Sequence, residues 1–209
     1  MDWELCSQHL TSGYIPVAVA LVLYFVLARI LKKQHHVGHI FISVVFTFYL
    51  VGILTMTGIW YRGAFSPRIV YVPFIDMIRG PIDTILNVFL FIPLGLFLPL
   101  LYDKFDRVGK VLLAGFLISL SVEIIQMFGC GATDINDLIT NTIGACAGYG
   151  VFKVLEKFIP EKWIGIFRIT GKNGYIELII FWIGTAIMML TVQPLLFHRL
   201  LGDCNGKYK

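Results

Sequence analysis

Two clusters of polar side chains interrupt apolar stretches of this 209-residue sequence. Glu123 and Gln126 lie within residues 111–128, where the only other polar side chains are two serines. The second cluster opens the next apolar segment and consists of Asp134, Asp137 and Asn141. An acidic or basic residue at the centre of a membrane helix costs ~2.5–3.5 kcal/mol on insertion scales, so it marks a candidate functional site by default. These clusters are therefore the first candidates for chemistry.

Helical spacing places each cluster on one face. Residues three apart on a helix are ~60° apart in projection, which puts Glu123 and Gln126 on a common face. The second cluster follows i, i+3, i+7 spacing and shares a face in the same way. The connection between the two segments is short, so the two helices must be antiparallel neighbours. Asn87, near the start of another apolar segment, is expected at the same level. We expect one substrate-binding site formed by Asn87, Glu123, Gln126, Asp134, Asp137 and Asn141.

Carboxylates and amides in such a site can bind a polar ligand or catalyse proton transfer. In the catalytic alternative, Glu123 is a general acid or base, while Asp134 and Asp137 hold a substrate or a divalent cation such as Mg²⁺ or Ca²⁺. No Ser/His or Cys/His arrangement accompanies them, which favours binding over catalysis; we predict no cofactor and no resident metal. Simpler roles remain open too. Asp134 suits a helix N-cap, and Asn87 and Asn141 suit hydrogen bonds between helices.

The composition indicates which elements position these residues. The chain is 57% hydrophobic and 14% charged, with a mean hydropathy of +0.81, whereas soluble domains carry about 25% charged residues. We predict an all-α integral membrane protein with about six transmembrane helices, at residues 14–31, 39–60, 84–101, 110–128, 135–152 and 175–192. Residues 158–169 are expected to form an interfacial helix or a linker. Prolines in residues 61–83 exclude a continuous helix there.

The distribution of Lys and Arg predicts the orientation. With the N-terminus outside, eleven of these residues fall in inner segments and six in outer segments. Inner loops of membrane proteins are enriched in positive charge. Both termini are therefore predicted to be extracytoplasmic, with the polar clusters at the outer end of their helices. The excess of positive charge is assigned to orientation, and no nucleic-acid partner is expected.

Cysteines, histidines and glycines receive structural interpretations. The four cysteines (Cys6, Cys130, Cys146 and Cys204) show no metal-ligand spacing, although a Cys6–Cys204 link between the tails stays open. His35, His36 and His39 lie at the predicted inner interface, and we favour solvated histidines over a metal site. Gly144, Gly148 and Gly150 predict close helix packing.

Three sequence blocks together resemble the VanZ-like family. They are Asn87-Val-Phe-Leu-Phe-Ile-Pro93-Leu-Gly95, Glu123-Ile-Ile-Gln126 and Asp134-Ile-Asn-Asp137-Leu-Ile-Thr-Asn141-Thr-Ile-Gly144, with Val72-Pro73-Phe74 upstream. The resemblance covers roughly residues 37–152. It divides the chain into a tail and first helix (1–36), a VanZ-like domain (37–152), a cytoplasmic interfacial segment (153–174) and a last helix with its tail (175–209). Unlike many relatives, residues 129–133 contain no Arg, so a charge partner for Asp134 or Glu123 is either missing or supplied by Arg62, Arg68 or Arg79.

The resemblance implies a protein of the bacterial plasma membrane that confers or modulates resistance to teicoplanin, a lipoglycopeptide. Its expected partners are membrane lipids and a peptidoglycan precursor or the drug, and its oligomeric state is undetermined. We expect an outward-facing site that binds one of these ligands without catalysis. The alternative is an intramembrane enzyme that modifies a lipid-linked envelope precursor, with Glu123 as the general acid or base.

Overall fold

The computed structural model describes residues 3–33, 35–58, 69–70, 80–128, 133–171 and 173–200. Within these residues the protein is almost entirely helical. The long helices are α1 (Trp3–Ile30), α2 (Val37–Met56), α4 (Pro81–Leu101), α5 (Val108–Gln126), α6 (Ile135–Glu156) and α8 (Asn173–Leu200). Shorter elements are β1 (Ile69–Val70), β2 (Thr133–Asp134), the 3-10 turn η1 (Asp103–Phe105) and α7 (Glu161–Phe167).

Six helices in this part of the chain are long and apolar enough to cross a membrane, which confirms the predicted fold class. A bilayer core offers the backbone no hydrogen-bonding partners, and a helix pairs these groups within its own segment. The first and last helices of the chain, α1 and α8, are longer than predicted. The helix α1 begins well before residue 14, and α8 passes through Pro194 instead of ending before it. A proline removes one backbone donor from a membrane helix, and neighbouring groups can accommodate that loss.

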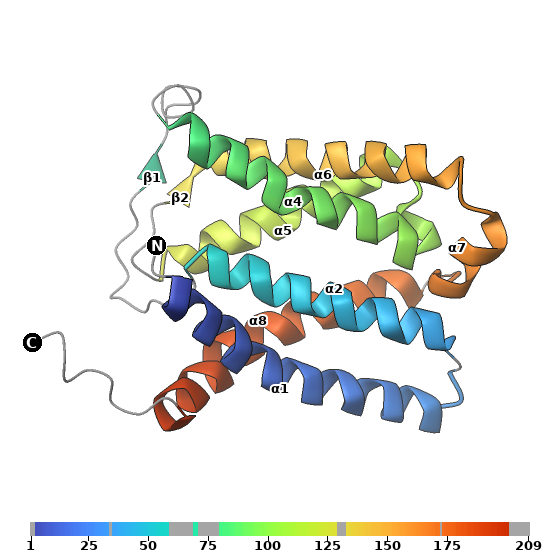
Figure 1. Ribbon diagram of the computed structural model, residues 1–209, viewed down its shortest axis with the longest axis horizontal. Coiled ribbons are helices and arrows are strands. Elements are labelled where there is room, and N and C mark those ends of the chain that lie inside the picture. The colour runs from blue at the N-terminus through green and yellow to red at the C-terminus, as the bar shows by residue number, and fades with distance from the viewer. Residues whose placement is uncertain are drawn as a thin grey trace, which may run out of the picture.

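The six helices form two groups that lie side by side (Figure 1). In one group, α6 packs against α4 and α5. In the other, α1 packs against α2 and α8, and α2 also contacts α8. The helix α2 touches α4 as well and so joins the groups. Polar residues of α4, α5 and α6 therefore lie closest to one another, as do those of α1, α2 and α8.

The interior is apolar and the outer surface is apolar too. Phe46 and Leu50 of α2 and Phe91 and Leu94 of α4 are completely buried in one core cluster. Many large aliphatic side chains are exposed, including Ile183, which is half exposed. A soluble monomer rarely exposes such extensive apolar surface, whereas a bilayer covers it. The surface therefore agrees with the membrane assignment from helix length.

The closest helix contact lies between α4 and α6 and depends on glycine. A side-chain carbon at Gly144 would overlap the carbonyl oxygen of Val88, and one at Gly148 would overlap that of Ile92. The predicted small-residue packing is confirmed at both positions, whereas Gly150 faces open space. The absence of side chains lets the two backbones approach closely. This contact sets the distance across which Asn87 and Asp137 meet.

The two ends of the bundle are held by different short elements. At one end, β1 pairs in parallel with β2, with Ile69 opposite Thr133 and Val70 opposite Asp134. At the opposite end, the amide of Ile169 donates to the carbonyl of Leu101, and the amide of Asp103 donates to the carbonyl of Ile169. These bonds tie the segment after α7 to the end of α4. The helical part of the predicted interfacial segment is α7.

Candidate functional site

Asn87 and Asp137 meet between α4 and α6. The Asn87 amide nitrogen donates a 2.6 Å hydrogen bond to a carboxylate oxygen of Asp137. Asn87 lies in the second turn of α4 and Asp137 in the first turn of α6, and both helices begin at the bundle end that carries β1 and β2 (Figure 1). Asp137 is near the positive end of the α6 dipole, which stabilises a carboxylate. The sequence blocks around these two residues therefore contribute to one place.

Glu123 brings the third helix, α5, to the same place. Its side chain is buried, with a carboxylate oxygen that accepts a 3.0 Å hydrogen bond from the backbone amide of Asp134. Asp134 is the N-cap of α6, and its carboxylate accepts from both the backbone and side-chain amides of Asn136. The predicted capping role of Asp134 is thus confirmed. The loop entering α6 is fixed by a side chain of α5. We use the term acidic site for Asn87, Glu123, Asp134 and Asp137.

Several carboxylates lie close together in and around the acidic site. The carboxylate of Glu123 is close enough to those of Asp134 and Asp137 for mutual repulsion when all are ionised. Asp137 experiences further repulsion from Asp83 at the start of α4. Ionised carboxylates only accept hydrogen bonds, so such a site favours a ligand with several hydrogen-bond donors.

Two of the predicted site residues are directed elsewhere. The Gln126 amide nitrogen donates a 2.8 Å hydrogen bond to the carbonyl of Thr57, just after α2. Asn141, buried between α5 and α6, donates to the hydroxyl of Ser119 at 2.9 Å. Gln126 shares a helix face with Glu123 by spacing, but its position as the last residue of α5 lets it contact the end of α2. Asn141 has the role expected of a hydrogen bond between helices.

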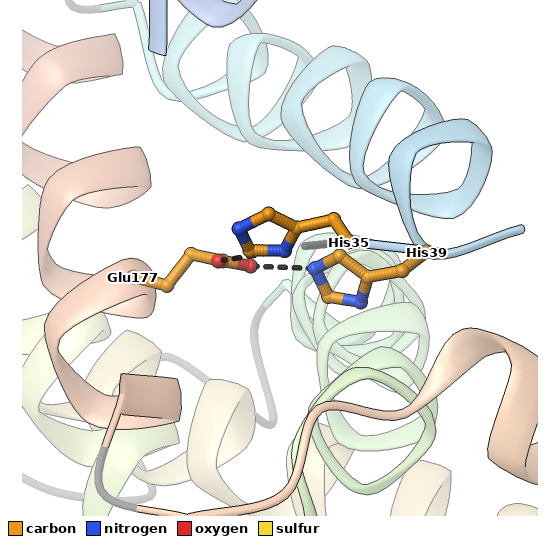
Figure 2. Close-up of side chains that lie close together, drawn as sticks. All are labelled: His35, His39 and Glu177. Carbon is orange, nitrogen blue, oxygen red and sulfur yellow. Dashed lines mark hydrogen bonds and ion pairs between the residues drawn. The ribbon is translucent and has the colours of Figure 1, made fainter. Parts of the chain in front are cut away.

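A second polar cluster lies at the opposite end of the bundle, where the prediction of solvated histidines is wrong. Only His36 is exposed; the side chain of His39 is 1% exposed and that of His35 is 9% exposed. Their partner is Glu177, buried near the start of α8, whose carboxylate lies 2.7 Å from His39 Nε2. We call His35, His39 and Glu177 the histidine cluster (Figure 2).

Sequence reasoning missed Glu177, which lies near the start of the sixth predicted helix. The available signal was the same one that singled out Glu123, namely a carboxylate in an otherwise apolar span. The neighbouring residues Ile176 and Leu178 to Ile180 are all apolar. The packing of α2 against α8 brings Glu177 next to His39, although the two residues are 138 positions apart in the sequence.

Several predicted features lie outside the described residues. They are the Val72-Pro73-Phe74 element, the loop arginines Arg62, Arg68 and Arg79, and the cysteines Cys130 and Cys204. Cys6 is a buried free thiol whose sulfur contacts that of Met56, and Cys146 is also free.

Comparison with known proteins assigns the chain. The sequence model of the VanZ/LLP1 family matches residues 13–156, which include all of the acidic site. This protein belongs to the VanZ/LLP1 family. It is 42% identical over 79 residues to Protein VanZ of Enterococcus faecium, an alignment that covers 36% of this chain and 47% of that protein. The chain thus matches about half the length of this curated relative. No solved structure matches.

The family match covers the whole acidic site but only part of the histidine cluster. All four residues of the acidic site fall within residues 13–156 of this VanZ/LLP1 protein. In the histidine cluster, His35 and His39 also fall within the match, but Glu177 lies beyond it on α8. The acidic site is therefore formed entirely by family sequence, whereas the histidine cluster also requires the helix that follows.

Proposed function

We propose that this VanZ/LLP1-family membrane protein acts in the bacterial plasma membrane and reduces susceptibility to glycopeptides of the teicoplanin type. The acidic site binds an envelope component or the drug through its carboxylates, on the extracytoplasmic side. Family membership supports the association with resistance, and the positive-inside rule supports the orientation. The predicted partners are a peptidoglycan precursor or the glycopeptide itself, with membrane lipids around the helices.

The observation that carries this proposal is the convergence of three helices. Two hydrogen bonds, Asn87 to Asp137 and Asp134 to Glu123, link α4, α5 and α6 at one bundle end. Structural needs alone would be met by neutral partners, since a hydrogen bond between membrane helices contributes only ~0.6 kcal/mol on average. Three neighbouring carboxylates, one of them buried, provide more hydrogen-bond acceptors than the contact between these helices requires. A ligand with several hydrogen-bond donors can bind to them.

The test is drug susceptibility of a glycopeptide-sensitive bacterium that expresses the protein. Glu123→Gln and Asp137→Asn each remove a charge and keep a carbonyl oxygen that can accept the observed hydrogen bond. Both variants are expected to lose the resistance conferred by the wild-type protein at equal membrane abundance. Teicoplanin and vancomycin are measured in parallel, because a difference between them identifies the lipid-bearing drug as the relevant one.

A matched control removes a carboxylate far from the acidic site. Glu161, exposed at the start of α7, lies at the other end of the bundle. Glu161→Gln should leave resistance unchanged. Full resistance in both Glu123→Gln and Asp137→Asn would refute the role of the acidic site.

The catalytic alternative depends on Glu123 as a general acid or base at a lipid-linked substrate. Its burial beside Asp134 and Asp137 is the observation that favours this candidate. Lipid-linked precursors extracted from cells with and without the protein distinguish the two functions. A chemically altered precursor that disappears with Glu123→Gln indicates an enzyme, and an unchanged precursor pool indicates binding.

A further inference from the structure

The histidine cluster lies at the bundle end opposite the acidic site and has no part in the proposed function. His35 precedes α2, His39 is in the first turn of α2, and Glu177 is near the start of α8. One ligand atom from each residue lies within 4.8 Å of the others. Figure 2 shows the three side chains pointing toward one another. Two histidines and a glutamate can bind a metal ion, or they can form an ion pair. The hydrogen bonds around them distinguish these two possibilities.

The hydrogen bonds of His39 define its tautomer. Its Nδ1 lies 2.6 Å from the carbonyl oxygen of Phe167. A carbonyl only accepts, so Nδ1 carries the hydrogen. In a neutral ring, the lone pair of Nε2 would then face the Glu177 carboxylate at 2.7 Å. Two acceptors cannot stabilise one another at this distance, so a proton or a metal ion must lie between them. A backbone carbonyl on the far ring nitrogen is also the usual support of a metal-ligating histidine.

The position of the Phe167 carbonyl is fixed by the fold. The next residues are held by the backbone hydrogen bond from Ile169 to Leu101. Gly38, beside His39, allows α7 to come close, because a side-chain carbon there would overlap Ile166. The orientation of the His39 ring is therefore set before any ion binds.

His35 distinguishes a metal site from a simple ion pair. Both of its ring nitrogens are buried and have no hydrogen-bond partner. Nδ1 is 3.9 Å from the second carboxylate oxygen of Glu177, too far for a hydrogen bond. Of the two nitrogens of a neutral imidazole ring, one carries a lone pair that can bind a metal ion. A protonated His39 would satisfy Glu177 and would still leave His35 unpaired.

The spacing of the ligand atoms fits a small divalent ion. Zn²⁺ binds imidazole nitrogen and carboxylate oxygen at about 2.0–2.2 Å, so ligand atoms in a tetrahedral site are roughly 3.3 Å apart. The contacts of 2.7 Å and 3.9 Å lie on either side of this value. All three ligand atoms lie within 4.8 Å of one another, so metal binding requires only local adjustment of these side chains. Tyr24 also donates a 2.9 Å hydrogen bond to Glu177, which orients the carboxylate.

We propose that His35, His39 and Glu177 form a binding site for a divalent transition-metal ion of the Zn²⁺ class, with one coordination position open. Two histidines and a glutamate are a known ligand set for Zn²⁺ sites that keep a fourth position for water or substrate. A cavity of about 460 Å³ adjoins the three residues and gives access to that position. Arg168 lines the cavity, but it interacts with Asp106 and Glu156 at 3.7 and 3.5 Å. These two carboxylates, which also bind Lys153, offset part of its repulsion of a metal ion, and Lys33 is a second cation in the cavity lining.

The test measures metal binding by the full chain, purified in detergent with a tag that contains no histidine. The protein is stripped with a chelator, loaded with Zn²⁺ and separated from excess ion, and its zinc content is measured by mass spectrometry. We expect one ion per chain, a higher Tm with Zn²⁺, and visible absorption bands of tetrahedral Co²⁺ when cobalt replaces zinc. Ligand binding to the native state raises Tm through mass action.

Three variants identify the ligands. His35→Gln and Glu177→Gln should each weaken Zn²⁺ binding at least ~10-fold, since even supporting residues change affinity by 10–100-fold. His36→Gln is the matched control, because the adjacent histidine is exposed and outside the cluster; it should bind Zn²⁺ like the wild type.

His35→Gln remains informative even if Glu177→Gln fails to fold, because His35 has no hydrogen bonds to lose. Wild-type protein that retains no Zn²⁺ would overturn the proposal. So would wild-type affinity in folded His35→Gln, and the cluster would then be an ion pair between His39 and Glu177.

Discussion

The amide of Asn87 donates a 2.6 Å hydrogen bond to the carboxylate of Asp137, and this bond joins α4 to α6 at the acidic site. The two residues belong to separate sequence blocks, 50 positions apart. The bond is asymmetric, because a neutral donor faces a charged acceptor. That asymmetry allows the pairing and the charge to be tested separately.

Exchanging the two side chains tests the pairing. Asn87→Asp replaces the donor with a second carboxylate and should lower the free energy of unfolding by about 1–3 kcal/mol, because the bond is lost and two like charges approach. The double variant Asn87→Asp/Asp137→Asn restores one donor and one acceptor and should recover most of that loss. Thermal unfolding in detergent measures both. A double variant no more stable than Asn87→Asp would contradict the pairing.

Glycine substitutions on α6 test the close contact with α4. Gly148→Ala places a carbon against the Ile92 carbonyl and should destabilise the protein by about 1–3 kcal/mol, the usual cost of overpacking. Gly150→Ala, only two residues away, enters open space and should be neutral or stabilising by up to ~1 kcal/mol from helix propensity. The same Tm change in both variants would show that packing is not the cause.

An ionic network at the opposite end should respond to salt. Lys153 lies 2.5 Å from Asp106 and 2.7 Å from Glu156, and Arg168 interacts with both carboxylates. These groups are partly exposed, so Asp106→Asn is expected to cost no more than about 1 kcal/mol. The Tm difference from wild type should shrink as salt concentration rises, because ions screen exposed pairs. A difference independent of salt would point to packing instead.

Single-cysteine labelling tests the predicted orientation. In a background with the native cysteines replaced by serine, Glu4→Cys places a thiol at the exposed start of α1, and Arg107→Cys places one at the exposed start of α5. These positions lie at opposite ends of the bundle (Figure 1). A membrane-impermeant maleimide should label Glu4→Cys in intact cells and Arg107→Cys only after lysis. The reverse pattern would place the acidic site inside.

Much of the acidic site was accessible from local sequence patterns. Glu123, Asp134 and Asp137 are separated by a short connection, so antiparallel packing of α5 and α6 forces them together. The position of a residue around the helix axis was a poorer guide to its contacts at the end of α5. Gln126 shares the face of Glu123, yet its amide reaches Thr57 because α2 ends nearby. Periodicity specifies a direction around an axis, while the neighbour in that direction depends on packing.

Six apolar segments could be assigned as membrane helices without coordinates, because a bilayer leaves backbone groups no alternative partners. The residues that permit close approach could be identified in the same way, since glycine has no side chain. Tertiary structure alone decided that His39 meets Glu177, a pairing across 138 residues. No local period encodes such a contact, because it arises only when α2 and α8 pack together and α7 positions the Phe167 carbonyl. His35 and His39, which the sequence analysis expected to be solvated, are therefore buried together with Glu177.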